Sequence, residues 1–135
     1  MDHASDSNPA PGFSRSPEHR VDIVPGPRRV RVEFAGAVIA DSADAVTVQE
    51  TGYEPVHYLP LADIKMALLQ PSERTSYCPF KGRANYYSAM VADRVAVNAA
   101  WTYASPYDEV AELRERIAFY PDRVAISVDD DGRPA

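Results

Sequence analysis

Apolar and polar side chains alternate along much of the chain, and this two-residue period is typical of β-strands with one buried face. The alternation covers residues 30–34 and 124–128, and residues 46–51 form a β-branched segment with the same period. Shorter apolar segments at residues 38–39 and 56–59 predict two further strands. The pattern therefore predicts a mainly β chain.

Residues 86–91 and 94–103 are two strand-like segments joined by Ala92-Asp93, and two residues is the commonest loop length of a β-hairpin. A two-residue loop places Met90 opposite Val95, Ser88 opposite Val97 and Tyr86 opposite Ala99, with residue 84 opposite Trp101. One face of the hairpin then carries Tyr86, Trp101 and Tyr103. Because both faces are largely apolar, the hairpin is expected in the centre of the sheet and covered on both sides.

Two segments carry helical signals. Leu61, Ile64 and Leu68 have the spacing of one helical turn, and Pro71 and Pro79 are expected to interrupt regular structure after it. Ser105-Pro106-Tyr107-Asp108 has a cap residue and a proline at the first helical position, which predicts a short helix at 106–115. The predicted fold is a small antiparallel β domain with one or two short helices.

The composition divides the chain into three parts. Residues 1–29 contain five of the twelve prolines and few large apolar side chains, so residues 1–28 are predicted to be a disordered tail. Residues 29–128 form one β-rich domain, long enough to bury a core without a metal or a disulfide. Residues 129–135 are predicted to be an acidic, frayed terminus.

Charge and residue counts exclude several function classes. The formal net charge of −6 lacks the basic footprint of a nucleic-acid binder, and no apolar segment is long enough to span a membrane. No secretory leader precedes the single cysteine, so a cytoplasmic location is expected. Without a Cys-x-x-Cys motif or a glycine-rich phosphate loop, we expect no metal and no cofactor.

Seven of the residues between 77 and 107 are aromatic, which indicates either an aromatic core or a pocket lined by aromatic faces. The segment Cys78-Pro79-Phe80-Lys81-Gly82 precedes the hairpin, so its turn is expected beside Trp101 and Tyr103. Lys81 is either a solvated cation or a clamp for an anionic group. Cys78 is either a buried, inert thiol or a nucleophile whose thiolate a nearby lysine favours. A Cys–His pair would need His57, which nothing in the sequence places beside Cys78.

Several blocks together resemble the family catalogued as domain of unknown function 427, over roughly residues 30–127. They are Glu50-Thr51, Val56-His57-Tyr58-Leu59-Pro60, Thr75-Ser76-Tyr77-Cys78-Pro79-Phe80-Lys81-Gly82, Asn98-Ala99-Ala100-Trp101-Thr102-Tyr103 and Ala118-Phe119-Tyr120. The resemblance implies a β-tent fold similar to methionine sulfoxide reductase B and to the thalidomide-binding domain of cereblon. Those relatives hold zinc through paired Cys-x-x-Cys motifs, which this sequence lacks. The family is sometimes labelled nucleotidyltransferase-like, but the Gly-Ser turn followed by Asp-x-Asp is absent here.

Three functions compete. The leading hypothesis is that an aromatic-lined pocket binds a small molecule or a short peptide, through Tyr58, Cys78, Lys81, Tyr86, Trp101 and Tyr103. In this hypothesis the aromatic rings stack on the ligand and Lys81 attracts an acidic group. The second is an enzyme that uses Cys78 or Lys81 as nucleophile or acid/base. The third is a structural or interaction module whose aromatic face docks a partner protein. An open pocket with Trp101 in its wall favours binding or catalysis, and a fully packed Trp101 favours the structural alternative.

Overall fold

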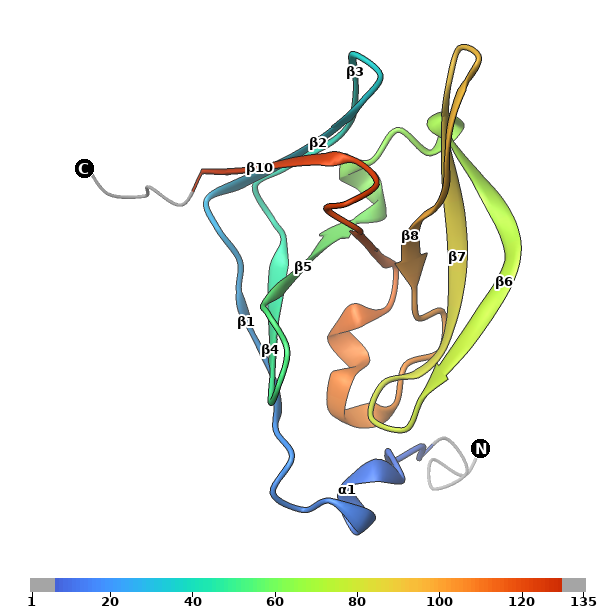
Figure 1. Ribbon diagram of the computed structural model, residues 1–135. Coiled ribbons are helices and arrows are strands. Elements are labelled where there is room, and N and C mark those ends of the chain that lie inside the picture. The colour runs from blue at the N-terminus through green and yellow to red at the C-terminus, as the bar shows by residue number, and fades with distance from the viewer. Residues whose placement is uncertain (1–6, 130–135) are drawn as a thin grey trace, which may run out of the picture.

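The alternating segments form strands of two antiparallel sheets in the computed structural model, which describes residues 7–129 (Figure 1). The strands are β1 (Val21–Pro25), β2 (Arg29–Phe34), β3 (Ala37–Ser42), β4 (Val46–Glu50), β5 (Val56–Pro60), β6 (Leu69–Cys78), β7 (Gly82–Val91), β8 (Arg94–Thr102), β9 (Arg116–Phe119) and β10 (Ala125–Asp129). The helices are α1 (Gly12–Arg15) and the 3-10 segments η2 (Leu61–Asp63), η3 (Met66–Leu68) and η4 (Asp108–Leu113). The mainly β fold class predicted from the sequence is confirmed.

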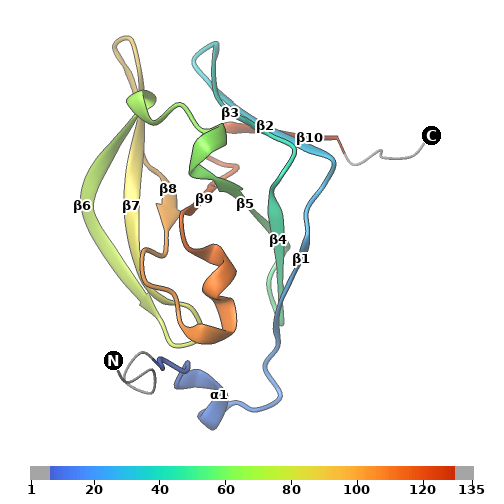
Figure 2. The same ribbon diagram turned by 180° about the vertical axis from the view of Figure 1, so that it is seen from behind.

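The larger sheet has the strand order β1-β4-β5-β9-β8-β7-β6, and the smaller has the order β10-β2-β3. The larger sheet bends so that β1, β4 and β5 form one wing and β6, β7 and β8 form the other (Figures 1 and 2). In both views η4 lies between the two wings, and the smaller sheet crosses the end of the molecule opposite to α1. This arrangement creates a concave face, and the candidate site lies on it.

Alternation gives the larger sheet two differently covered faces. Leu59, Ile117 and Phe119 pack with Val30 and Ile39 of the smaller sheet in one core cluster. On the opposite face, Tyr58, Tyr86 and Ala118 pack with Val110 and Leu113 of η4 in a second cluster. Short strands β5 and β9 therefore contribute to both cores through neighbouring residues.

The predicted two-residue loop between β7 and β8 is confirmed, because Val91 pairs with Arg94 and Met90 with Val95. The pairing shifts beyond Ala89 and Ala96, so Tyr86 lies opposite Trp101 rather than opposite Ala99 as predicted. Asn98 absorbs the shift with a left-handed backbone (φ 50°), and its N–H donates to Ser88 Oγ at 3.0 Å. The prediction that both faces are covered is wrong at the loop end, where Val95 and Val97 are about half exposed.

The sequence prediction missed β6, which pairs with β7 although Pro71 was expected to interrupt the chain there. β6 is an edge strand, where a proline costs no ladder hydrogen bond on the solvent side, and the register shifts between Pro71 and Thr75. Most of its side chains are exposed, so it carries no alternating signal. The turn predicted at residues 61–68 is confirmed as η2 and η3, and the helix predicted at 106–115 is the shorter η4.

The predicted disordered tail is wrong for residues 7–28. β1 pairs with β4 along its whole length, from Val21–Glu50 to Pro25–Val46. Composition alone misjudged this segment because a five-residue edge strand needs few apolar side chains once β4 offers a partner. Residues 1–6 of the predicted tail lie outside the described residues. The predicted frayed terminus begins at Asp129, which still pairs with Arg29, and its remainder lies outside the described residues.

No helix of residues 7–129 is long and apolar enough to cross a membrane.

A chain that begins at Gly26 lacks α1 and β1 and leaves β4 as an unpaired edge. We expect its melting temperature to fall by at least about 5 °C, the shift that about 1 kcal/mol causes in a domain of this size. Differential scanning calorimetry of the full and shortened chains measures the change. Equal melting temperatures would contradict the packing of β1 on β4.

Candidate functional site

The six residues predicted from the sequence line one cavity of about 330 Å³ on the concave face of the larger sheet. We call it the aromatic cavity. Its lining residues are Val48, Glu50, Tyr53, Glu54, Val56, Tyr58, Cys78, Lys81, Tyr86, Trp101, Tyr103 and Tyr120. They come from both wings of the sheet and from the loops that follow β4, β6, β8 and β9. The bend of the sheet therefore brings together residues that are far apart in the sequence.

Strand register sets the back of this cavity. Tyr58 pairs with Ala118, Ala118 with Trp101, and Trp101 with Tyr86, so the four residues form one row on one face. Ala118 is fully buried and small, which leaves room for the two large rings on either side of it. The Trp101 indole Nε1–H donates to the Tyr58 hydroxyl oxygen at 3.1 Å, and the rings meet edge to face. This hydrogen bond joins the two wings above Ala118.

Two buried tyrosines present neutral hydroxyls. Burial raises the pKa of Tyr58 far above its ordinary value, and hydrogen bonding from Trp101 opposes this only in part. Burial also raises the pKa of Tyr103, and the nearby Tyr58 adds to the effect. Both phenols therefore stay protonated across the physiological range and are able to donate a hydrogen bond.

Lys81 lies at the end of the cavity nearest α1 and is buried. Its ammonium forms an ion pair with Glu50 Oε1, and Glu50 Oε2 is 2.9 Å from His19 Nε2. The Lys81 ammonium is also 3.9 Å from Cys78 Sγ. The prediction of Lys81 as a solvated cation is wrong, because a carboxylate compensates its charge inside the protein.

The loop that carries Lys81 is held by contacts from both sides. The Gly12 N–H donates to the Pro79 carbonyl at 3.0 Å, and the His19 ring stacks on Phe80 with centroids 4.1 Å apart. On the other side, the Tyr107 N–H donates to the Lys81 carbonyl at 3.0 Å. Gly82 has φ +121°, and a side chain there would meet the Ser105 carbonyl, so the glycine next to Lys81 is required.

Tyr120 and Tyr86 form the side of the cavity near β6. Their rings are parallel with centroids 6.5 Å apart, and the Tyr120 ring lies 4.3 Å from that of Trp101. Burial and a hydrogen bond with Tyr86 raise the pKa of Tyr120 to about 12. Burial also raises the pKa of Tyr86, but hydrogen bonds from Ser76, Tyr120 and Arg74 outweigh it, and the net pKa is lowered.

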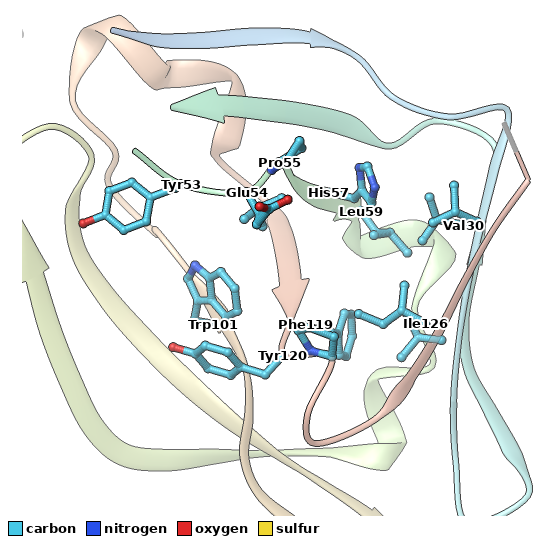
Figure 3. A pocket seen from close by; sticks show the side chains of 14 residues that line it. Val30, Tyr53, Glu54, Pro55, His57, Leu59, Trp101, Phe119, Tyr120 and Ile126 are labelled. Atoms are coloured by element: carbon cyan, nitrogen blue, oxygen red, sulfur yellow. The ribbon is translucent and has the colours of Figure 1, made fainter. Parts of the chain in front are cut away.

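A second cavity of about 490 Å³ lies between the larger and the smaller sheet, and we call it the apolar cavity (Figure 3). Its lining residues are Val30, Val32, Tyr53, Glu54, Pro55, Val56, His57, Leu59, Trp101, Phe119, Tyr120, Pro121, Ile126 and Val128. In Figure 3 Val30, Leu59 and Ile126 gather at one end, whereas Tyr53, Trp101 and Tyr120 lie at the other.

The arrangement offers Cys78 no histidine base among the residues that line the aromatic cavity. His57 lines the apolar cavity, and its Nδ1 is 2.8 Å from Thr47 Oγ1. The Lys81 ammonium, 3.9 Å from the thiol, is already paired with Glu50. No group of three potential metal ligands occurs within residues 7–129.

Sequence reasoning did not include Glu50, Tyr53, Glu54 and Tyr120 among the site residues, nor His19 behind them. Glu50 and Tyr120 belong to sequence blocks that carry the family resemblance, and this membership could have identified them as site residues. His19 lies in the segment predicted to be a disordered tail, so its contact with Glu50 had no signal in the sequence.

The chain belongs to the family described as Domain of unknown function (DUF427), whose family model matches residues 22–130. The match begins within β1, so β1 is part of the family domain. No curated protein matches the sequence. The likeness to methionine sulfoxide reductase B and cereblon stays a prediction.

Replacing Glu50 by glutamine leaves the buried Lys81 ammonium without its counter-charge. We expect the free energy of unfolding to fall by about 3 kcal/mol in urea titrations, since breaking one side of a buried pair costs about 3–5 kcal/mol. The double variant Glu50→Gln/Lys81→Met removes the stranded charge and is expected to recover part of the loss.

The matched control is Glu33→Gln, which breaks the exposed pair between Glu33 and Arg31. Its unfolding midpoint is expected close to that of the unchanged protein, because exposed pairs contribute little. Equal losses in Glu50→Gln and Glu33→Gln would show that the Lys81 pair is not a buried constraint.

Proposed function

We propose that this protein binds a small, uncharged aromatic molecule with hydrogen-bonding groups in the aromatic cavity. The observation that carries the proposal is the convergence of Tyr58, Trp101 and Tyr103 from separate strands and loops on one hollow. Trp101 is only half-buried and lines this hollow, which favours a binding role over a purely structural one.

The buried charges of the cavity lining compensate each other, and the remaining charged lining residue, Glu54, is exposed, which supports an uncharged ligand. The one lysine in the lining is paired with Glu50, and burial keeps Tyr58 and Tyr103 protonated. A charged ligand would lose its hydration without gaining a free counter-charge from these groups, which is unfavourable. This replaces the expectation that Lys81 attracts an acidic group.

Size and chemistry agree with a ligand of one or two rings. The cavity of about 330 Å³ is at the small end of the range of about 300–1,000 Å³ for ligand pockets. The faces of Trp101 and Tyr120, 4.3 Å apart at their centroids, offer stacking surface at the mouth. The hydroxyls of Tyr58 and Tyr103 offer hydrogen bonds deeper inside.

The alternative of an enzyme is tied to one contact, the 3.9 Å approach of Cys78 Sγ to the Lys81 ammonium. The rate at which an alkylating probe reacts with Cys78, measured as a function of pH, distinguishes an enzyme from a binding protein. A thiolate that forms well below the ordinary thiol pKa of about 8.5 would favour nucleophilic catalysis. Ordinary titration would leave binding as the function.

The binding test uses the only tryptophan as its reporter, because the chain then has a single indole N–H resonance. Benzamide and benzoate have nearly the same shape and differ in charge. We expect benzamide to shift the Trp101 indole N–H signal in a saturable way and benzoate to bind at least ten-fold more weakly. Tyr103→Phe is expected to lower the affinity for benzamide about two- to ten-fold, the effect of one lost hydrogen bond.

Cys78→Met places a longer side chain in the cavity wall and is also expected to lower the affinity for benzamide. Val97→Met on the exposed part of β8 is the matched control and is expected to change nothing. A Trp101 signal that does not respond to benzamide, or that responds equally in Cys78→Met, would contradict the proposal.

A further inference from the structure

The aromatic cavity and the apolar cavity share the wall formed by Tyr53, Glu54, Val56, Trp101 and Tyr120. Two hollows that share five lining residues meet along that wall. The shared residues include the reporter Trp101, and Figure 3 shows Tyr53, Trp101 and Tyr120 together at one end of the apolar cavity.

The strand pairing explains why the cavities meet there. The ladder between β5 and β9 runs from Pro60–Arg116 to Tyr58–Ala118 and stops. The next pairs in the same register would be His57 with Phe119 and then Val56 with Tyr120, but no pairing continues to them. The pairing of β5 with β9 therefore ends before Val56 and Tyr120, two of the residues that the cavities share, which makes a break in the hydrogen-bonded sheet there.

The two hollows differ in chemistry. The aromatic cavity presents the hydroxyls of Tyr58 and Tyr103, whereas the far end of the apolar cavity is formed by Val30, Leu59, Ile126 and Val128. Val30 and Leu59 are buried and Val128 is 45% exposed, so this end of the apolar cavity meets water at Val128. An apolar hollow that shares a wall with a hollow lined by tyrosine hydroxyls is suited to a ligand that is apolar at one end and polar at the other.

We propose that the two cavities bind one amphipathic ligand, with an uncharged aromatic head in the aromatic cavity and an unbranched alkyl tail in the apolar cavity. The tail passes Trp101 and Tyr120 at the break in the sheet. This inference rests on the proposed function and specifies the ligand class, an alkyl-substituted uncharged aromatic compound.

The test is a chain-length series with a constant head group: benzamide and its 4-ethyl, 4-butyl and 4-hexyl derivatives, each titrated against the Trp101 indole N–H signal. Each methylene that enters an apolar site adds about 0.8 kcal/mol, so affinity is expected to rise roughly four-fold per methylene. The rise should end when the tail reaches the end of the apolar cavity.

Two matched valine variants locate the tail. Val128→Asp places a carboxylate in the wall of the apolar cavity, and Val97→Asp places one at an exposed position of β8 that lines neither cavity. Val128→Asp is expected to lower the affinity for 4-hexylbenzamide at least ten-fold and to leave the affinity for benzamide unchanged. Val97→Asp is expected to leave the affinity for both ligands unchanged.

Binding of benzamide without any gain along the series would overturn the two-cavity ligand and leave the proposed function standing. A gain that is equal in Val128→Asp and in the unchanged protein would place the tail elsewhere and would also overturn it. No response to benzamide or to any longer derivative would overturn both proposals.

Discussion

The hydrogen bond from the Trp101 indole to the Tyr58 hydroxyl is the contact on which the site depends. It spans Ala118 in the central strand and joins side chains from the two wings of a bent sheet. A larger residue in place of Ala118 would push the two rings apart, and a register shift in β9 would turn one of them to the other face. The placement of the Tyr58 and Trp101 rings and the shape of the back of the cavity follow from this row.

The other end of the cavity depends on a buried charge pair rather than on ring packing. Glu50 is the last residue of β4, and its carboxylate receives Lys81 from the loop after β6 and His19 from the segment before β1. A buried pair of this kind contributes less to net stability than to fixing one arrangement, since either charge alone would be costly there. Three distant segments are thereby fixed around one carboxylate, and the lysine in the cavity lining has its charge compensated.

The sequence predicted the strands whose two faces differ, because a half-buried strand alternates by necessity. It also predicted that Tyr86 and Trp101 share a face, although their predicted register was wrong. The shift at Asn98 moves the partner by two residues, and a shift by an even number leaves each side chain on its face. Edge strand β6 was missed because its exposed side chains and Pro71 remove the alternation. Edge strand β1 is partly buried up to Val24, and it was missed because the proline-rich composition around it predicted a tail. The contacts of Lys81 with Glu50 and of His19 with Glu50 were missed because no local pattern encodes a pairing across 31 residues.

The most direct test of the row that joins the two wings is hydrogen exchange at the single indole N–H, in the unchanged protein and in Tyr58→Phe. Slow exchange of the Trp101 indole proton is expected in the unchanged protein, since it is bonded to the Tyr58 oxygen at 3.1 Å. Markedly faster exchange is expected in Tyr58→Phe, with the backbone N–H of the buried Ala118 still protected. An indole proton that exchanges as fast as free tryptophan in the unchanged protein would contradict the row that forms the back of the cavity.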